Sequence, residues 1–177
     1  MIKTERNKFI LGKAYYALSE YYDYTRTNEL VERIRLVDSA VSAYKESGQT
    51  ERMAYCLKVL ADLHTNNEEY FKALSDCNLS LQAYQSIHYL WIQPVYDLIG
   101  TAYSELGDFK AALTNELLAL KIADNLHDSS MQRCEIEYNI GSIFELLRDS
   151  GAAIRHLISA MKIADLLSLI HISEPTR

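Results

Sequence analysis

The chain has 177 residues, of which 49% are apolar, and it carries a formal net charge of -6. This length is enough for one domain with a substantial core, and the acidic balance argues against general nucleic-acid binding, because phosphate recognition needs a basic surface. No apolar run approaches the roughly 18 residues of a membrane helix, and no signal-peptide block follows the amino terminus. We therefore expect a cytoplasmic chain without a membrane segment, unless it is a piece of a longer protein that is membrane-attached or exported.

The side chains that usually carry chemistry show no catalytic arrangement. The three cysteines, Cys56, Cys77 and Cys134, never have the C-x-x-C spacing of a disulfide framework or a zinc site. None of the five histidines lies in a metal-binding motif, and the sequence contains no Gly-rich phosphate loop, nucleophile elbow or HExxH. We therefore predict three buried thiols, no metal, no cofactor and no catalytic residue.

Hydrophobic periodicity predicts four helices in the amino-terminal half. The first covers about residues 5–24, and the second runs to about Glu46, after which Gly48 suits a left-handed C-cap. The third helix covers about residues 51–65, and the fourth ends near Ile87.

Five tyrosines lie close together at the end of the first predicted helix: Tyr15, Tyr16, Tyr21, Tyr22 and Tyr24. A helix cannot bury all five on one stripe, because they surround much of its circumference. Two interpretations stay open. The rings pack against the next helix with their hydroxyls in solvent, or they form an exposed aromatic patch that contacts a partner.

The carboxyl-terminal half is predicted to contain four more helices. Pro94 fits the first turn of the fifth helix, and a tight turn at Gly107-Asp108 separates the fifth from the sixth. Residues 126–129 lead to the seventh helix, and Ser150 is placed to cap the eighth.

One spacing of small and aromatic residues recurs in these helix pairs. Its clearest copy consists of Gly100, Tyr103 at +3, Gly107 at +7, Phe109 at +9, Ala112 at +12 and Ala119 at +19. The small residues let two antiparallel helices approach closely, and the large ones fill the space beside them. The matching positions of two other pairs hold Ala61, His64, Tyr70, Ala73 and Ser80, and Gly141, Phe144, Ala153 and Ala160. Because His64 takes the place of a packing aromatic, we predict that it lies in the core.

The repeat has a period near 40 residues, since Ala40, Ser80, Ala119 and Ala160 are 40, 39 and 41 residues apart. The period divides residues 1–167 into four units of a single domain, and the first unit is irregular, as terminal repeats often are. The units cover about residues 5–47, 50–87, 92–126 and 129–167.

The periodicity stops after Leu167. Residues 168–177 are predicted to be a non-repeat tail, which resembles a translated sequencing adapter, so that the chain is a truncated piece of a longer protein. No helix follows to cover the apolar side chains of the eighth helix, among them Ile154, Ile158 and Met161. This uncapped helix is a candidate surface for self-association.

The recurring pattern resembles the tetratricopeptide (TPR) repeat over about residues 5–167. The resemblance implies an all-α, right-handed solenoid of about eight antiparallel helices in four hairpins. Segments 121–128 and 138–147 further resemble the TPR input regions of bacterial sensor histidine kinases and related regulators. The implied function is a non-catalytic scaffold that binds a protein or peptide on a concave face lined by the first helix of each unit.

The resemblance also assigns residues to that concave groove. Asn139 matches the asparagine with which many TPR repeats bond a peptide backbone. The other groove positions are Lys58, Asp62, Thr65 and Asn66, then Asp97, Thr101, Ser104 and Glu105, then Tyr138, Ser142, Glu145 and Leu146, and the irregular first unit contributes Phe9, Lys13, Tyr16 and Ala17. The clamp that holds the acidic carboxyl terminus of heat-shock chaperones is not expected, because Asp62 and Asp97 stand among its positions.

Two further roles are compatible with the repeat. The chain can be the sensory or regulatory region of a bacterial signal-transduction protein, a histidine kinase or a transcriptional regulator. Peptide-pheromone receptors that regulate transcription also use such arrays, but they need a DNA-binding helix-turn-helix, and none is visible in this sequence.

Overall fold

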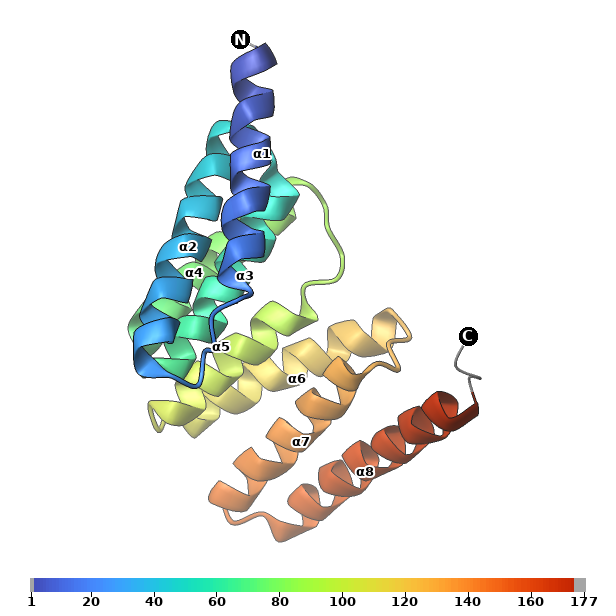
Figure 1. Cartoon of the computed structure of the whole chain (residues 1–177). Coiled ribbons are helices and arrows are strands. Elements are labelled where there is room, and N and C mark those ends of the chain that lie inside the picture. The colour runs from blue at the N-terminus through green and yellow to red at the C-terminus, as the bar shows by residue number, and fades with distance from the viewer. Residues whose placement is uncertain (1, 174–177) are drawn as a thin grey trace. The chain divides into compact units, whose positions relative to one another are not determined.

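A computed structural model describes residues 2–173, and the side chains of residues 4–168. The described chain is all-α, as predicted, and its helices pack as successive hairpins (Figure 1). The helices are α1 (Ile2–Ser19), α2 (Thr27–Glu46), α3 (Thr50–Asn66), α4 (Tyr70–Ser86), α5 (Gln93–Glu105), α6 (Phe109–Asn125), α7 (Met131–Leu146) and α8 (Ser150–Ser173). The chain divides into two compact bundles, an N-terminal bundle of residues 1–90 and a C-terminal bundle of residues 91–177.

The first helix ends at Ser19, whereas the periodicity predicted an end near residue 24. The Ser19 hydroxyl donates to the Tyr16 carbonyl over 2.6 Å. Further on, the Asp23 carboxylate accepts hydrogen bonds from the amide and the hydroxyl of Thr25, at 2.9 and 2.7 Å. These local side-chain bonds offer the backbone an alternative to helical hydrogen bonding, and they explain the early end of α1.

The early end of α1 divides the tyrosine cluster, so the prediction that all five tyrosines surround one helix was wrong. Tyr15 and Tyr16 lie on α1 and pack, half-buried, against the core between α2 and α3. Tyr21 and Tyr24 lie in the turn that follows, where they are 85% and 51% exposed. Tyr15 and Tyr16 therefore agree with the packing interpretation. Tyr21 and Tyr24 are exposed, and their contact with a partner stays a prediction.

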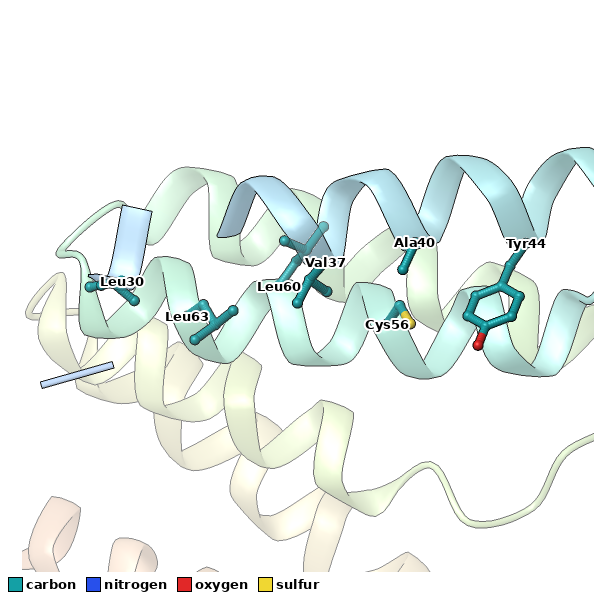
Figure 2. Close-up of a cluster of buried hydrophobic side chains, with 7 residues drawn as sticks. All are labelled: Leu30, Val37, Ala40, Tyr44, Cys56, Leu60 and Leu63. Carbon is teal, nitrogen blue, oxygen red and sulfur yellow. The ribbon is translucent and has the colours of Figure 1, made fainter. Parts of the chain in front are cut away.

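The core of the N-terminal bundle forms where α2 faces α3. Figure 2 shows its buried side chains, which come from both helices: Leu30, Val37, Ala40, Tyr44, Cys56, Leu60 and Leu63. Helix α1 closes over this core at Gly12, where an added Cβ would come within 2.9 Å of the Tyr44 ring. The glycine therefore allows α1 to pack directly against the aromatic face.

Two predictions about polar core positions are refined by the structure. Cys56 and Cys77 are buried thiols outside any disulfide, as predicted, whereas the Cys134 thiol is only partly buried. The His64 side chain is 12% exposed, and its Nδ1 lies 2.7 Å from Oδ2 of Asp76 on α4. His64 thus joins α3 to α4 through a hydrogen bond, in a position where its counterparts use an aromatic ring.

The described turns between helices from α2 to α8 each contain one residue in the left-handed region. These residues are Gly48, Glu68, His88, Gly107, His127 and Arg148, with φ between 52° and 79°. The prediction for Gly48 is thereby confirmed. In the last turn, the Asp149 amide donates to the Phe144 carbonyl over 2.9 Å, which closes the end of α7. The capping side chain of α8 is Asp149, which accepts from the Ala152 amide at 3.0 Å, and not Ser150 as predicted.

The left-handed conformation disfavours residues that carry a Cβ, and this makes Arg148 a site for stabilisation. We expect Arg148→Gly to raise the free energy of unfolding by about 1 kcal/mol, because glycine adopts this conformation without steric cost. Urea denaturation measures the change. The matched control is Arg155→Gly, the same change on the exposed face of α8, which should lower stability by about 1 kcal/mol. Equal effects of the two substitutions would contradict this account of the turn.

The C-terminal bundle packs its hairpins through the small residues of the repeat. Ala112 and Ala119 of α6 have no exposed surface, and Ala119 packs with Ile136 and Ile140 of α7. In the last hairpin, an added Cβ on Gly141 would come within 2.8 Å of Leu157. These contacts agree with the close approach that the spacing predicted.

The outer face of α8 exposes several large apolar side chains: Ile154, Ile158, Met161 and Leu166. The helix continues to Ser173, beyond the point at which the repeat periodicity stops. The last four residues of the predicted tail, 174–177, lie outside the described residues.

The absence of free space around Ala112 predicts a sharp size limit at this position. We expect Ala112→Leu to lower the free energy of unfolding by about 1–3 kcal/mol, because the added atoms force α5 and α6 apart. Thr114→Leu places the same side chain on the exposed face of the same helix and should change stability by less than about 0.5 kcal/mol. Thermal melting of both variants measures the difference, and an unchanged melting temperature for Ala112→Leu would disprove the assigned register.

Candidate functional site

A hollow of about 280 Å³ opens in the C-terminal bundle between α5 and α7. The residues that line it are Thr101, Ser104, Glu105, Glu116, Tyr138, Asn139, Ser142, Ile143 and Leu146. Seven of these nine are positions that the repeat resemblance assigned to a groove, and the exceptions are Glu116 and Ile143. Two helices that are not adjacent in sequence therefore bring their predicted groove residues to one place.

Helical spacing explains why these side chains converge. On α5, Thr101, Ser104 and Glu105 are three and four residues apart, so they share one face of the helix. On α7, Ser142 and Leu146 lie four residues apart on the face that meets α5. Helix α6 contributes Glu116 to the same hollow.

Asp97 holds the two lining helices together. Its Oδ1 accepts a hydrogen bond from Nδ2 of Asn139, and its Oδ2 accepts one from Nε2 of Gln132, both at 2.8 Å. Asp97 is only 8% exposed, and it does not line the hollow as the groove assignment expected. Because the Asn139 amide donates to Asp97, the carboxylate fixes the orientation of a side chain that does line the hollow.

Glu116 is the residue of this site that the sequence analysis missed. Its side chain has no exposed surface, and neither carboxyl oxygen has a hydrogen-bond partner of ordinary geometry among the described residues. Burial, with the charge of Asp97 beside it, raises the pKa of Glu116 to about 10, and the Asn139 amide opposes this shift only in part. Glu116 is therefore a neutral acid at pH 7.

The repeat register contained the signal that identifies Glu116. The residue follows Gly100 by sixteen positions, and the same step leads from Gly141 to Leu157 and from Ala61 to Cys77. An added Cβ on Gly100 would come within 2.7 Å of Oε1 of Glu116. A carboxyl group thus occupies the core position that the last hairpin fills with leucine.

Apart from Glu145 of α7, which does not line this hollow, the remaining predicted groove residues lie on α1 and α3 of the N-terminal bundle. The Lys58 ammonium lies 5.1 Å from the centre of the Tyr55 ring, and the Thr65 hydroxyl donates to the Ala61 carbonyl over 2.9 Å. Asp62 accepts from the Asn66 amide through its backbone carbonyl at 3.0 Å. A hollow of about 260 Å³ in this bundle has one predicted groove residue, Tyr16, in its lining. The other lining residues are Tyr44, Glu51, Arg52, Tyr55, Cys56, Tyr84 and Tyr89.

Neither a metal-binding cluster nor a membrane-spanning helix is found among the described residues. Among the described residues, no three His, Cys, Asp or Glu side chains are grouped so that they could hold a metal ion. Within residues 2–173, no helix has the length and apolar character needed to cross a membrane.

Neither a protein-family model nor a curated protein matches this sequence. The fold, in contrast, matches solved structures. BtubC (BKLC) from P. vanneervenii superposes with a TM-score of 0.77 and 19% identity, over 96% of this chain and 68% of BtubC. The apo form of RapI gives a TM-score of 0.74 and 18% identity, over 94% of this chain and 58% of RapI.

A Rap protein complexed with competence and sporulation factor matches with a TM-score of 0.71 and 17% identity, over 93% of this chain and 43% of the Rap protein. Identities this low show the fold alone, and the fold is a TPR-like helical repeat. The chain therefore has the fold of the TPR-like repeat proteins.

The raised pKa of Glu116 makes the stability of the protein depend on pH. The ordinary pKa of this group is 4.5, so above that pH the unfolded chain loses a proton that the folded chain retains up to about pH 10. The free energy of unfolding therefore falls as pH rises through this range, by up to about 1.4 kcal/mol per pH unit from this one group.

We expect wild type to lose about 3 kcal/mol relative to Glu116→Gln between about pH 5 and pH 7.5, because glutamine cannot titrate. Urea denaturation of both proteins across this range measures the difference. A stability difference that does not change with pH would show that Glu116 ionises normally in the folded protein.

Proposed function

We propose that the C-terminal bundle binds an extended peptide segment in the hollow between α5 and α7, as a non-catalytic scaffold. The observation that carries this proposal is the convergence of seven groove positions on one hollow. The lining offers the mixed chemistry that peptide recognition needs. It has hydroxyl and amide groups for hydrogen bonds, and it has Ile143, Leu146 and the Tyr138 ring for apolar side chains.

The hydrogen-bond network beneath the hollow supports a binding role. Asn139 and Gln132 are held by one carboxylate, Asp97, at 2.8 Å each, so α5 and α7 are fixed relative to one another before any ligand arrives. A preformed site loses less conformational entropy when it binds, and this strengthens binding.

The structural comparison supports the same class of ligand. The Rap protein whose fold matches this chain is complexed with competence and sporulation factor. For the present chain we propose a peptide ligand, and the residues that line the hollow determine which peptide side chains it accepts.

A peptide-regulated role in bacterial signalling is the second candidate. It is favoured by the two Rap structures among the fold matches and by the likeness of segments 121–128 and 138–147 to sensor input regions. A kinase or DNA-binding domain encoded downstream in the same reading frame would support this role, and the absence of both would reject it.

A peptide library displayed on phage tests the proposal directly. Purified full chain should enrich a consensus sequence over repeated rounds of selection. Thr101→Arg places a large charged side chain in the hollow and should lower affinity for the enriched peptides by about tenfold or more, since each lost or blocked contact of this kind costs over 1 kcal/mol.

The matched control is Thr114→Arg, which makes the same change on the exposed face of α6, outside the hollow. Binding by this variant should equal binding by wild type, and circular dichroism checks that both variants are folded. A wild-type chain that enriches no peptide, or a Thr101→Arg chain that binds as wild type does, would reject the hollow as a peptide site.

A further inference from the structure

The ionisable side chains of Asp, Glu, Lys, Arg or His type that line the hollow in the C-terminal bundle are all acidic. Two carboxyl side chains, Glu105 and Glu116, line it, and none of its lining residues is lysine, arginine or histidine. Asp97 adds a third carboxyl group behind Asn139. A site of this composition favours a cationic ligand and repels an anionic one.

The carboxyl oxygens of Glu116 are specific acceptor atoms for such a cationic ligand. A buried carboxyl without hydrogen-bond partners costs stability, and the equivalent position of the last hairpin holds a leucine, Leu157. Both oxygens of Glu116 lack a partner of ordinary geometry, although the side chain forms part of the wall of the hollow. A ligand that donates hydrogen bonds would satisfy both oxygens.

We propose that the hollow receives a lysine or arginine side chain of the bound peptide, and that Glu116 is the carboxylate that pairs with it. This inference rests on the proposed peptide-binding function and specifies its ligand. On binding, the O–H bond of Glu116 breaks and its proton leaves to solvent, while the carboxylate forms a charge-assisted hydrogen bond to the ammonium or guanidinium group.

The side chains around Glu116 are consistent with the loss of its proton when a cation binds. From α5, the charge of Asp97 opposes ionisation of Glu116 in the empty site, and Glu105 is the other carboxyl group that lines the hollow. From α7, the uncharged Asn139 and the phenol of Tyr138 are the groups that share the hollow. A bound cation reverses this balance, since it favours the ionised form of a carboxyl group. The hydroxyls of Ser104 and Ser142 are acceptors for the remaining donors of the cation.

The test compares the peptides that wild type, Glu116→Gln and Glu105→Gln select from one displayed library. Wild type should enrich peptides with lysine or arginine at one fixed position. For a leading peptide, replacing that lysine with norleucine should weaken binding by about 10- to 100-fold, the range expected for a hydrogen bond between charged groups. Glu116→Gln should remove this difference, and Glu105→Gln, the same change at the other lining carboxyl, should retain it.

Proton release on binding is a second measurement, and it would not depend on Glu116 if this residue had only a structural role. The affinity of wild type for the lysine peptide should rise by up to about tenfold per pH unit between about pH 6 and pH 8, because one proton leaves the complex. Titration calorimetry in buffers of different ionisation enthalpy should count about one proton released for wild type and none for Glu116→Gln.

Selected peptides without a fixed basic residue, or a lysine preference that survives Glu116→Gln, would overturn this inference and leave the peptide-binding proposal intact. A wild-type chain that enriches no peptide at all would reject the peptide-binding proposal itself. Thermal melting shows whether each variant is folded, and Glu116→Leu, which copies the residue of the last hairpin, is the second variant if Glu116→Gln does not fold.

Discussion

The close packing of the helix pairs depends on a glycine that lies opposite a large side chain of the paired helix, because the missing Cβ lets the two helices approach. The contact occurs in three hairpins, where Gly12 faces Tyr44, Gly100 faces Glu116 and Gly141 faces Leu157. In each case an added Cβ would come within 3 Å of the opposing side chain. Because protein interiors are close-packed, a contact of this kind fixes the separation of the two helices and the rotation of each about its own axis. The faces left for binding follow from that rotation.

The same contact explains how a functional group enters a structural position. A tyrosine or leucine opposite the glycine only fills space, whereas Glu116 fills it with a carboxyl group that the surrounding core cannot solvate. Burial and the charge of Asp97 keep this group protonated, so the bundle tolerates an acid that would otherwise be costly. The wall of the hollow between α5 and α7 thus contains a protonated carboxyl group.

Much of the fold was predictable from the sequence, because the relevant signals are local. The small and aromatic residues at fixed spacing identified the helix pairs, and Gly48 and Gly107 marked turns with left-handed residues. The first helix was predicted too long because periodicity takes no account of hydrogen bonds from the side chains of Ser19 and Asp23. The repeat resemblance named seven of the residues that line the hollow between α5 and α7. It missed Glu116, which holds a register position that is apolar in two other hairpins.

The sequence by itself determined that the chain is all-α, how its helices pair and which faces of the first helices in each hairpin are polar, because helical period and residue size act between neighbours in the chain. The tertiary structure decided which of those polar faces meet. It joined α5 to α7 through Asp97, Asn139 and Gln132, and it placed the α3 residues Lys58 and Asp62 in another bundle. It also decided that Glu116 is neutral, because the pKa of a carboxyl group is set by burial and by charges that only the folded chain brings near it.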